Sequence, residues 1–154
     1  MKKLRLYLDT SVIGGCFDKE FEEFSNQLML EITDSLAIPV ISSITVAEIE
    51  NAPDMIKKQL KKILKLPHTE EIFVTQEINN LGMQYLDQKV IPKKSQADAF
   101  HIAAATVNKV DILVSWNFKH IVNVHRIFGF NSVNLKEGYQ TLDIRSPREV
   151  LKNV

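Results

Sequence analysis

Short apolar runs alternate with longer amphipathic stretches along the whole chain. Runs of β-branched and other apolar residues predict five strands, whereas apolar positions repeating at helical spacing predict helices between them. The expected strands are 4–9, 38–43, 71–75, 111–116 and 139–144. The expected helices are 21–36, 45–51, 54–66, 76–90, 97–110 and 118–128, with a last one beginning at Pro147.

This alternation is typical of a parallel sheet covered by helices on both faces. Several strands are short and wholly apolar, and the 97–110 helix is apolar nearly all round, which indicates that it is buried. No repeat, low-complexity tract or Gly/Ser linker interrupts the chain. We therefore expect one α/β domain over residues 1–154, with three α/β/α layers and a central, mainly parallel sheet.

Composition fits such a domain. The chain has 154 residues, of which 45% are hydrophobic and 25% charged, and Cys16 is its one cysteine. No apolar run approaches the roughly 20 residues of a membrane span, and the N-terminus lacks the apolar core and cleavage site of a signal peptide. These features predict a cytoplasmic protein without a membrane partner, an internal disulfide or a cysteine-rich zinc site.

Charge is balanced overall but not along the sequence. Residues 1–77 hold 9 Lys/Arg and 13 Asp/Glu, a net charge of −4, and residues 78–154 hold 10 and 6, a net charge of +4. The second half can therefore face an anionic partner, although a zero net charge does not demand one.

Four polar residues follow strands, or begin the helices after them. Asp9 ends the first strand, Glu48 lies on the short helix after the second, Asp98 begins the buried helix and Asn117 follows 111–116. Ligands of open α/β sheets bind at the carboxyl ends of strands. Acidic groups gathered there would repel one another unless a cation bound between them. A hard cation such as Mg²⁺ takes oxygen ligands and serves phosphodiester hydrolysis.

Each of these residues also has a purely structural interpretation. Asp9 and Asn117 can form turns at strand ends. Glu48 completes a capping-box pattern that begins at Thr45. Asp98 suits the positive end of a helix dipole. The functional hypothesis therefore depends on the four residues occurring together.

Four motifs resemble the PIN domain family, in particular the VapC-type toxin ribonucleases of toxin–antitoxin pairs. They are "LYLDTSV", "SSITVAEIE", "ADAFHIAAA" and "DILVSWNFKHI", in the order and spacing of that family over about residues 4–128. The resemblance implies a ribonuclease that depends on Mg²⁺ or Mn²⁺, with Asp9, Glu48 and Asp98 as metal ligands. It also implies a cognate antitoxin and a homodimer. Asn117 completes the catalytic set where the family usually has aspartate.

RNA would require cations near this site. The expected contacts lie just before Asp98 or around Asn117, and they are Lys93, Lys94, Ser115, Lys119, His120 and Arg126. Ser115 could alternatively hold a water or a ligand carboxylate. For the cations, a solvated helix face is the competing interpretation. His101 and Trp116 are expected to be core residues rather than a base and a stacking platform.

Two other functions stay open on the sequence alone. One is a degenerate, non-catalytic PIN-like domain that binds RNA or protein, which Asn117 favours. The other is a phosphatase with Asp9 as nucleophile, but such enzymes carry a second aspartate two residues later, where this chain has Ser11.

Overall fold

The computed structural model describes residues 2–152, and its five strands form a single sheet. The strands are β1 (Leu4–Leu8), β2 (Ala37–Ser42), β3 (Glu70–Ile72), β4 (Ile112–Val114) and β5 (Asp143–Arg145). Their order in the sheet is β3-β2-β1-β4-β5, and every neighbouring pair is parallel. The sheet is thus wholly parallel, where the sequence predicted a mainly parallel one.

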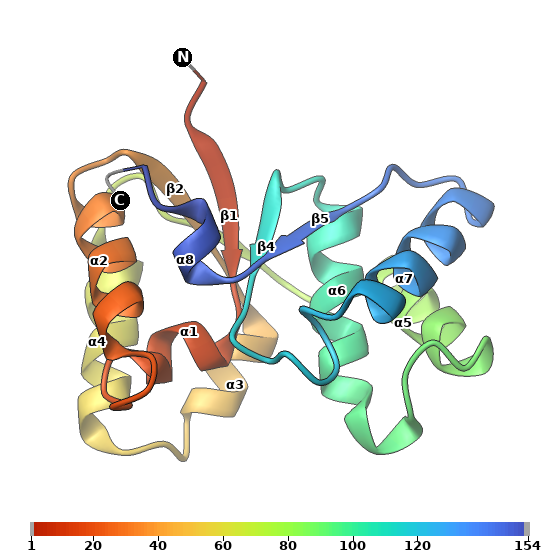
Figure 1. The fold of residues 1–154 in the computed structure, drawn as a ribbon, viewed down its shortest axis with the longest axis horizontal. Coiled ribbons are helices and arrows are strands. Elements are labelled where there is room, and N and C mark those ends of the chain that lie inside the picture. Colours follow the sequence, from red (N-terminus) through yellow and green to blue (C-terminus); the bar gives the residue numbers. More distant parts are fainter. Residues whose placement is uncertain (1, 153–154) are drawn as a thin grey trace.

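Helices join the strands and cover both faces of the sheet (Figure 1). They are α1 (Thr10–Gly15), α2 (Glu22–Thr33), α3 (Ser43–Ile49), α4 (Asp54–Lys65), α5 (Gln76–Asp87), α6 (Gln96–Val107), α7 (Val124–Lys136), α8 (Pro147–Val150) and the 3₁₀ turn η1 (Lys93–Ser95). None of the helices within residues 2–152 has both the length and the apolar character needed to span a membrane.

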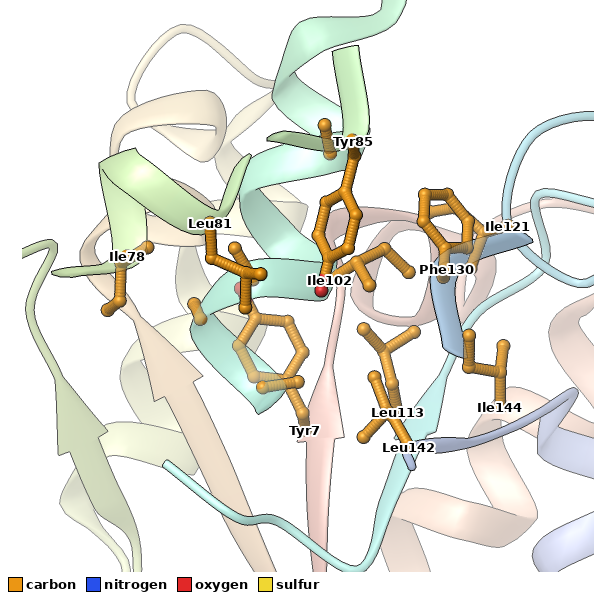
Figure 2. Packing of buried hydrophobic residues seen from close by; sticks show 14 of the residues in the cluster. Tyr7, Ile78, Leu81, Tyr85, Ile102, Leu113, Ile121, Phe130, Leu142 and Ile144 are labelled. Carbon is orange, nitrogen blue, oxygen red and sulfur yellow. The ribbon is translucent and has the colours of Figure 1, made fainter. Parts of the chain in front are cut away.

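Two hydrophobic cores lie on opposite faces of the sheet. Alternate residues of a strand point to opposite faces, so Tyr7 of β1 joins the core beneath α5, α6 and α7, whereas Leu6 and Leu8 join the core beneath α1, α2 and α4. Figure 2 shows the first core, in which Tyr7 and Tyr85 lie on either side of Ile102. The predicted three-layer α/β/α architecture is confirmed.

Close packing of α5 on α6 explains the glycine within α5. A Cβ atom on Gly82 would lie 2.3 Å from Cδ1 of Phe100. Only a residue without a side chain allows the two helices to approach this closely. Gly82 therefore permits the contact that holds α6, and with it Asp98, against the rest of the layer.

The remaining differences from the sequence predictions are local. Helix α1 was not expected, because six residues are too few to show a helical period. The helix expected over 118–128 is wrong in position: residues 118–123 form turns, and α7 begins only after Asn123, whose side chain accepts the amide proton of Arg126. The last strand likewise begins later than expected, since 139–142 carries no strand hydrogen bonding.

The strand order defines where a ligand would bind. The chain runs from β1 outward to β2 and β3, and then crosses back to the other side of β1 to form β4 and β5. In such sheets a crevice opens beyond the carboxyl ends of the two strands at which the direction reverses. That point lies between β1 and β4, which end immediately before Asp9 and Ser115.

Candidate active site

Three hydrogen bonds fix the Asp9 carboxylate just after the end of β1. Its Oδ1 accepts hydrogen bonds from the Ser11 hydroxyl (2.6 Å) and the Val12 amide (3.2 Å), which makes it the N-cap of α1, and its Oδ2 accepts from the Ser115 hydroxyl (2.5 Å). Burial raises the pKa of Asp9, and these hydrogen bonds oppose the rise. Asp9 is 4% exposed, and one of its donors is Ser11, which stands where a phosphatase would carry its second aspartate.

Glu48 projects from α3 toward the same region. The alternative interpretation, a capping box with Thr45, is wrong, because α3 begins after Ser42, whose side chain caps the Thr45 amide, and Glu48 lies in the body of the helix. Its Oε1 instead accepts hydrogen bonds from the Thr10 hydroxyl (2.7 Å) and from Nε2 of His101 (2.5 Å). Burial opposes ionisation, but these hydrogen bonds outweigh it and keep the pKa of Glu48 below its usual value.

Asp98 and Asn117 meet across the gap between α6 and the end of β4. Asp98 lies in the first turn of α6, as predicted, and its Oδ2 accepts a hydrogen bond from Nδ2 of Asn117 (3.3 Å). Asn117 Oδ1 accepts the amides of Lys119 and His120, so this residue is also the turn former that its position suggested. Burial raises the pKa of Asp98, and the Asp9 and Glu48 carboxylates raise it further.

Ser115 requires a correction. It was expected among the RNA contacts, but its side chain is fully buried and its hydroxyl is donated to Asp9, which leaves no surface for RNA. The alternative interpretation, that Ser115 holds a ligand carboxylate, agrees with the structure. The same hydroxyl accepts the Asn117 amide (2.9 Å) and thereby connects Asp9 to the loop that carries Asn117.

Among the basic residues expected to contact RNA, His120 lies within electrostatic reach of Asp98. Lys93, Lys94 and Lys119 are exposed. Burial lowers the pKa of His120, Asp98 raises it, and the charges of Arg126, Lys119 and Lys94 lower it, which shows that these groups lie within electrostatic reach of one another. Arg126 is partly engaged already, because its guanidinium donates to the Val90 carbonyl.

His101 and Trp116 are both buried, as expected of core residues. The Trp116 indole stacks on Phe21 and donates to the Ser25 hydroxyl (2.8 Å), so it offers no face to a base. His101 is hydrogen bonded at both ring nitrogens, but one of its partners is Glu48. The sequence did not predict this link, nor the roles of Tyr7, Thr10 and Ser11.

The structure brings Asp9, Glu48, Asp98 and Asn117 to one edge of the sheet, and all four can offer oxygen ligands. Within residues 2–152, no three His, Cys, Asp or Glu side chains are arranged so that they could hold a metal ion as they stand. The fit of a cation is chemical: the donors are the oxygens that Mg²⁺ and Mn²⁺ prefer, and Asp98 lies within electrostatic reach of the Asp9 and Glu48 carboxylates, whose repulsion a cation would relieve.

Comparison with known proteins bears on the fold. No family model matches the sequence, and no curated protein is significantly similar to it. Solved structures do match. VapBC2 from Rickettsia felis, bound to a DNA fragment from its promoter, matches over 93% of this chain and 98% of its own, with 17% identity and a TM-score of 0.56.

Two further matches are of the same kind. VapC20 of Mycobacterium tuberculosis, described as a toxin that cleaves the sarcin–ricin loop, covers 74% of this chain and 91% of its own, with 11% identity and a TM-score of 0.58. DNA-bound VapBC from Salmonella typhimurium covers 94% and 98%, with 16% identity and a TM-score of 0.53. The fold is therefore that of VapC toxins, as the motifs predicted.

Proposed function

We propose that this chain is an endoribonuclease that depends on Mg²⁺ or Mn²⁺ and acts as the toxin of a toxin–antitoxin pair. The observation that carries the proposal is the set of Asp9, Glu48 and Asp98, with Asn117, at the switch point of a fold shared with VapC toxins. Since solved toxins with this fold include a ribonuclease, RNA is the substrate to test first.

Asp9, Asp98 and Glu48 would hold the cation. Mg²⁺ in phosphate-handling sites is usually bound by one or two carboxylates, with waters and substrate oxygens completing its shell. Asp9 is fixed by three donors, whereas Asp98 and Glu48 are only partly buried and can adjust. When bound, the cation would supply Lewis-acid stabilisation of the scissile phosphate.

The protein groups around this set would position the RNA. Lys93, Lys94, Lys119 and Arg126 provide positive charge on the side of the site where Asp98 lies, which counters the repulsion between phosphate and carboxylates. Asn117 keeps Asp98 oriented through its amide and adds no charge of its own. The reaction needs no covalent enzyme intermediate, in agreement with the engaged oxygens of Asp9.

An antitoxin and a second copy of the chain are the partners we propose. The solved relatives in fold include toxin–antitoxin complexes. A groove of about 370 Å³ between α3 and α4 is lined by apolar side chains and edged by lysines, which suits an amphipathic, acidic segment. The lining residues are Val46, Ile49, Glu50, Lys57, Leu60, Lys61 and Leu64. Light scattering of the purified chain tests the homodimer.

Calorimetric titration with Mn²⁺ tests the proposal without prior choice of an RNA. Wild type should bind, Asp98→Asn should not, and the control Asp34→Asn, at the exposed C-cap of α2, should bind as wild type does. RNA cleavage by the same three proteins should follow the same order. Cleavage by Asp98→Asn at the wild-type rate would contradict the proposal.

The second candidate is a non-catalytic domain of the same fold. It is favoured by one contact: where a fourth carboxylate would attract a cation, Asn117 donates an amide proton to Asp98. This candidate predicts no Mn²⁺ binding at millimolar concentration and no cleavage of RNA. Asn117→Asp should then create metal binding, because it replaces that donor by a charge.

A further inference from the structure

A chain of buried hydrogen bonds leads from the core of the protein to Glu48. Ser42 Oγ and Tyr7 Oη are 2.6 Å apart, Tyr7 Oη and His101 Nδ1 are 2.6 Å apart, and His101 Nε2 lies 2.5 Å from Glu48 Oε1. The Tyr7 and His101 rings also pack edge to face, with centroids 5.6 Å apart. The chain thus connects β1, which ends just before Asp9, to β2 and to α3 and α6, which carry Glu48 and Asp98.

These polar groups are buried in a hydrophobic core, where apolar side chains could pack equally well. Tyr7 is 0%, Ser42 1% and His101 2% exposed, and Tyr7 belongs to a core made mostly of aliphatic side chains. A buried polar group contributes little net stability even when satisfied, and costs about 1–3 kcal/mol when it loses its partner. Stability alone therefore does not account for the chain. The chain of hydrogen bonds ends at Glu48, whose side chain is 35% exposed.

The carboxylate end of the chain fixes one proton, because an ionised carboxylate only accepts and His101 must donate to Glu48 from Nε2. With the ring neutral, Nδ1 is an acceptor, and Tyr7 donates its single hydroxyl proton to it. The Tyr7 oxygen then accepts from the hydroxyl of Ser42, while Ser42 itself accepts the Thr45 amide.

We propose that Tyr7 is a positioning residue for the metal site: through His101 it directs a proton at Glu48 Oε1 and so fixes the orientation of that carboxylate. Oε1 is then fully used by His101 and Thr10. No hydrogen bond reaches Oε2 from any residue between 2 and 152, which leaves Oε2 as the oxygen available to a cation. The inference rests on the proposed function only in taking the acidic site to bind a divalent cation.

Removal of the Tyr7 hydroxyl tests the proposal, with Tyr85→Phe as matched control. Both tyrosines are fully buried in the same core, and the Tyr85 hydroxyl also bonds to two buried groups, Thr106 and Asn134, away from the carboxylates. We expect Tyr7→Phe to weaken Mn²⁺ binding about tenfold or more, as for other groups that orient a metal ligand. Tyr85→Phe should lose similar stability and no affinity. Equal Mn²⁺ affinity of the two variants would overturn the proposal.

Two variants at His101 provide a test by rescue. His101→Gln keeps an amide donor for Glu48 and a carbonyl acceptor for Tyr7, whereas His101→Ala removes both. The proposal requires glutamine to retain more of the Mn²⁺ affinity than alanine. If His101→Gln and His101→Ala were equally stable to heat and lost the same Mn²⁺ affinity, His101 would only fill space.

The ring itself reports the arrangement without any substitution. In ¹⁵N NMR spectra of the wild-type protein, His101 should carry its proton on Nε2, and Tyr7→Phe should reduce that preference. A proton on Nδ1, alone or in addition, would overturn the proposal. If wild type binds no Mn²⁺, the proposed function fails, but the tautomer still decides whether Tyr7 directs the proton.

Discussion

Two buried hydrogen-bond networks adjoin the same hydrophobic core, one around Tyr7 and the other around Tyr85. The Tyr85 hydroxyl donates to Asn134 Oδ1 and lies 3.4 Å from the Thr106 hydroxyl, and Asn134 Nδ2 donates to Asn131 (3.2 Å). Asn131 in turn bonds to both backbone groups of Leu142 (2.7 and 3.0 Å). This second network joins α5, α6 and α7 to the segment before β5, and all its ends are internal.

The two networks use the same chemistry but end differently. The Tyr85 network closes on amide and carbonyl groups of the protein, so that its whole effect is to hold the layer together. The Tyr7 network ends on a carboxylate that reaches the surface of the candidate site. The comparison suggests that a buried polar network that ends on a partly exposed ionised group serves the site, and that one with internal ends serves the fold.

Replacement of the ionised end of the Tyr7 network should have the largest effect. Glu48→Gln removes the charge, but its amide oxygen can still accept from His101 and Thr10. We expect RNA cleavage to fall on the order of 100-fold, while thermal stability stays near that of wild type. Single-turnover cleavage and thermal denaturation measure the two effects. A rate within threefold of wild type would remove Glu48 from the site.

Disruption of the Tyr85 network should give the opposite result. Asn134→Leu removes the oxygen to which the Tyr85 hydroxyl donates and the amide group that donates to Asn131. The free energy of unfolding should fall by about 1–3 kcal/mol. Urea denaturation measures this loss, and Mn²⁺ titration of the folded variant should give the wild-type affinity. A change in affinity would show that the two networks are not independent.

Loss of an acid at the site should make the metal-free protein more stable. The folded pKa of Asp98 is raised, so the folded state loses stability as pH rises from the ordinary aspartate value through the raised one, and the full cost is present at neutral pH. Asp98→Asn lacks this cost. Its denaturation midpoint without metal should exceed that of wild type at pH 7, by about 2–4 °C per kcal/mol gained, and the difference should shrink toward acidic pH. A lower midpoint for Asp98→Asn than for wild type at pH 7 would contradict the cost of ionising Asp98 in the folded protein.

The smallest effect is expected for RNA binding by the lysines around the candidate site. Alanine at Lys94 or Lys119 should lower the slope of log K for RNA against log salt by roughly 0.7 per lost phosphate contact. The control is Lys136→Ala, because Lys136 lies in the last turn of α7, the helix that carries Asn134. Filter binding over a range of salt concentrations measures the slopes. Equal slopes for all the proteins would identify the two lysines as a solvated surface.

Periodicity and strand ends carried much of the prediction. The apolar runs identified the strands of the sheet. The rule that ligands bind at strand ends predicted from the sequence that Asp9 and Asn117 lie close together. Boundaries were harder, because side-chain caps determine them. Ser42 rather than Thr45 starts α3, and Asn123 delays α7 although Ile121 and Val122 continue an apolar pattern.

Contacts between distant elements could not be predicted. The link from Tyr7 to His101 depends on how β1 packs against α6, 94 positions apart in the chain, and no spacing in the sequence encodes it. Ser115 was noted as a polar residue near the site, but its burial follows from the register of β4 against β1. One signal was present: three consecutive polar residues, Asp9 to Ser11, directly after a buried strand.

Ionised Asp98 destabilises the folded protein, and this cost changes what retention of the residue would mean in evolution. Asparagine at this position would fit the same space and remove the cost of a partly buried charge and its repulsion from Asp9 and Glu48, so selection for folding alone favours loss of the aspartate. Random drift would therefore replace the aspartate in lineages that no longer need the site, and their chains would remain folded. In related sequences, an aspartate kept at this position would be a mark of activity, and its absence a mark of chains that survive only as binding partners.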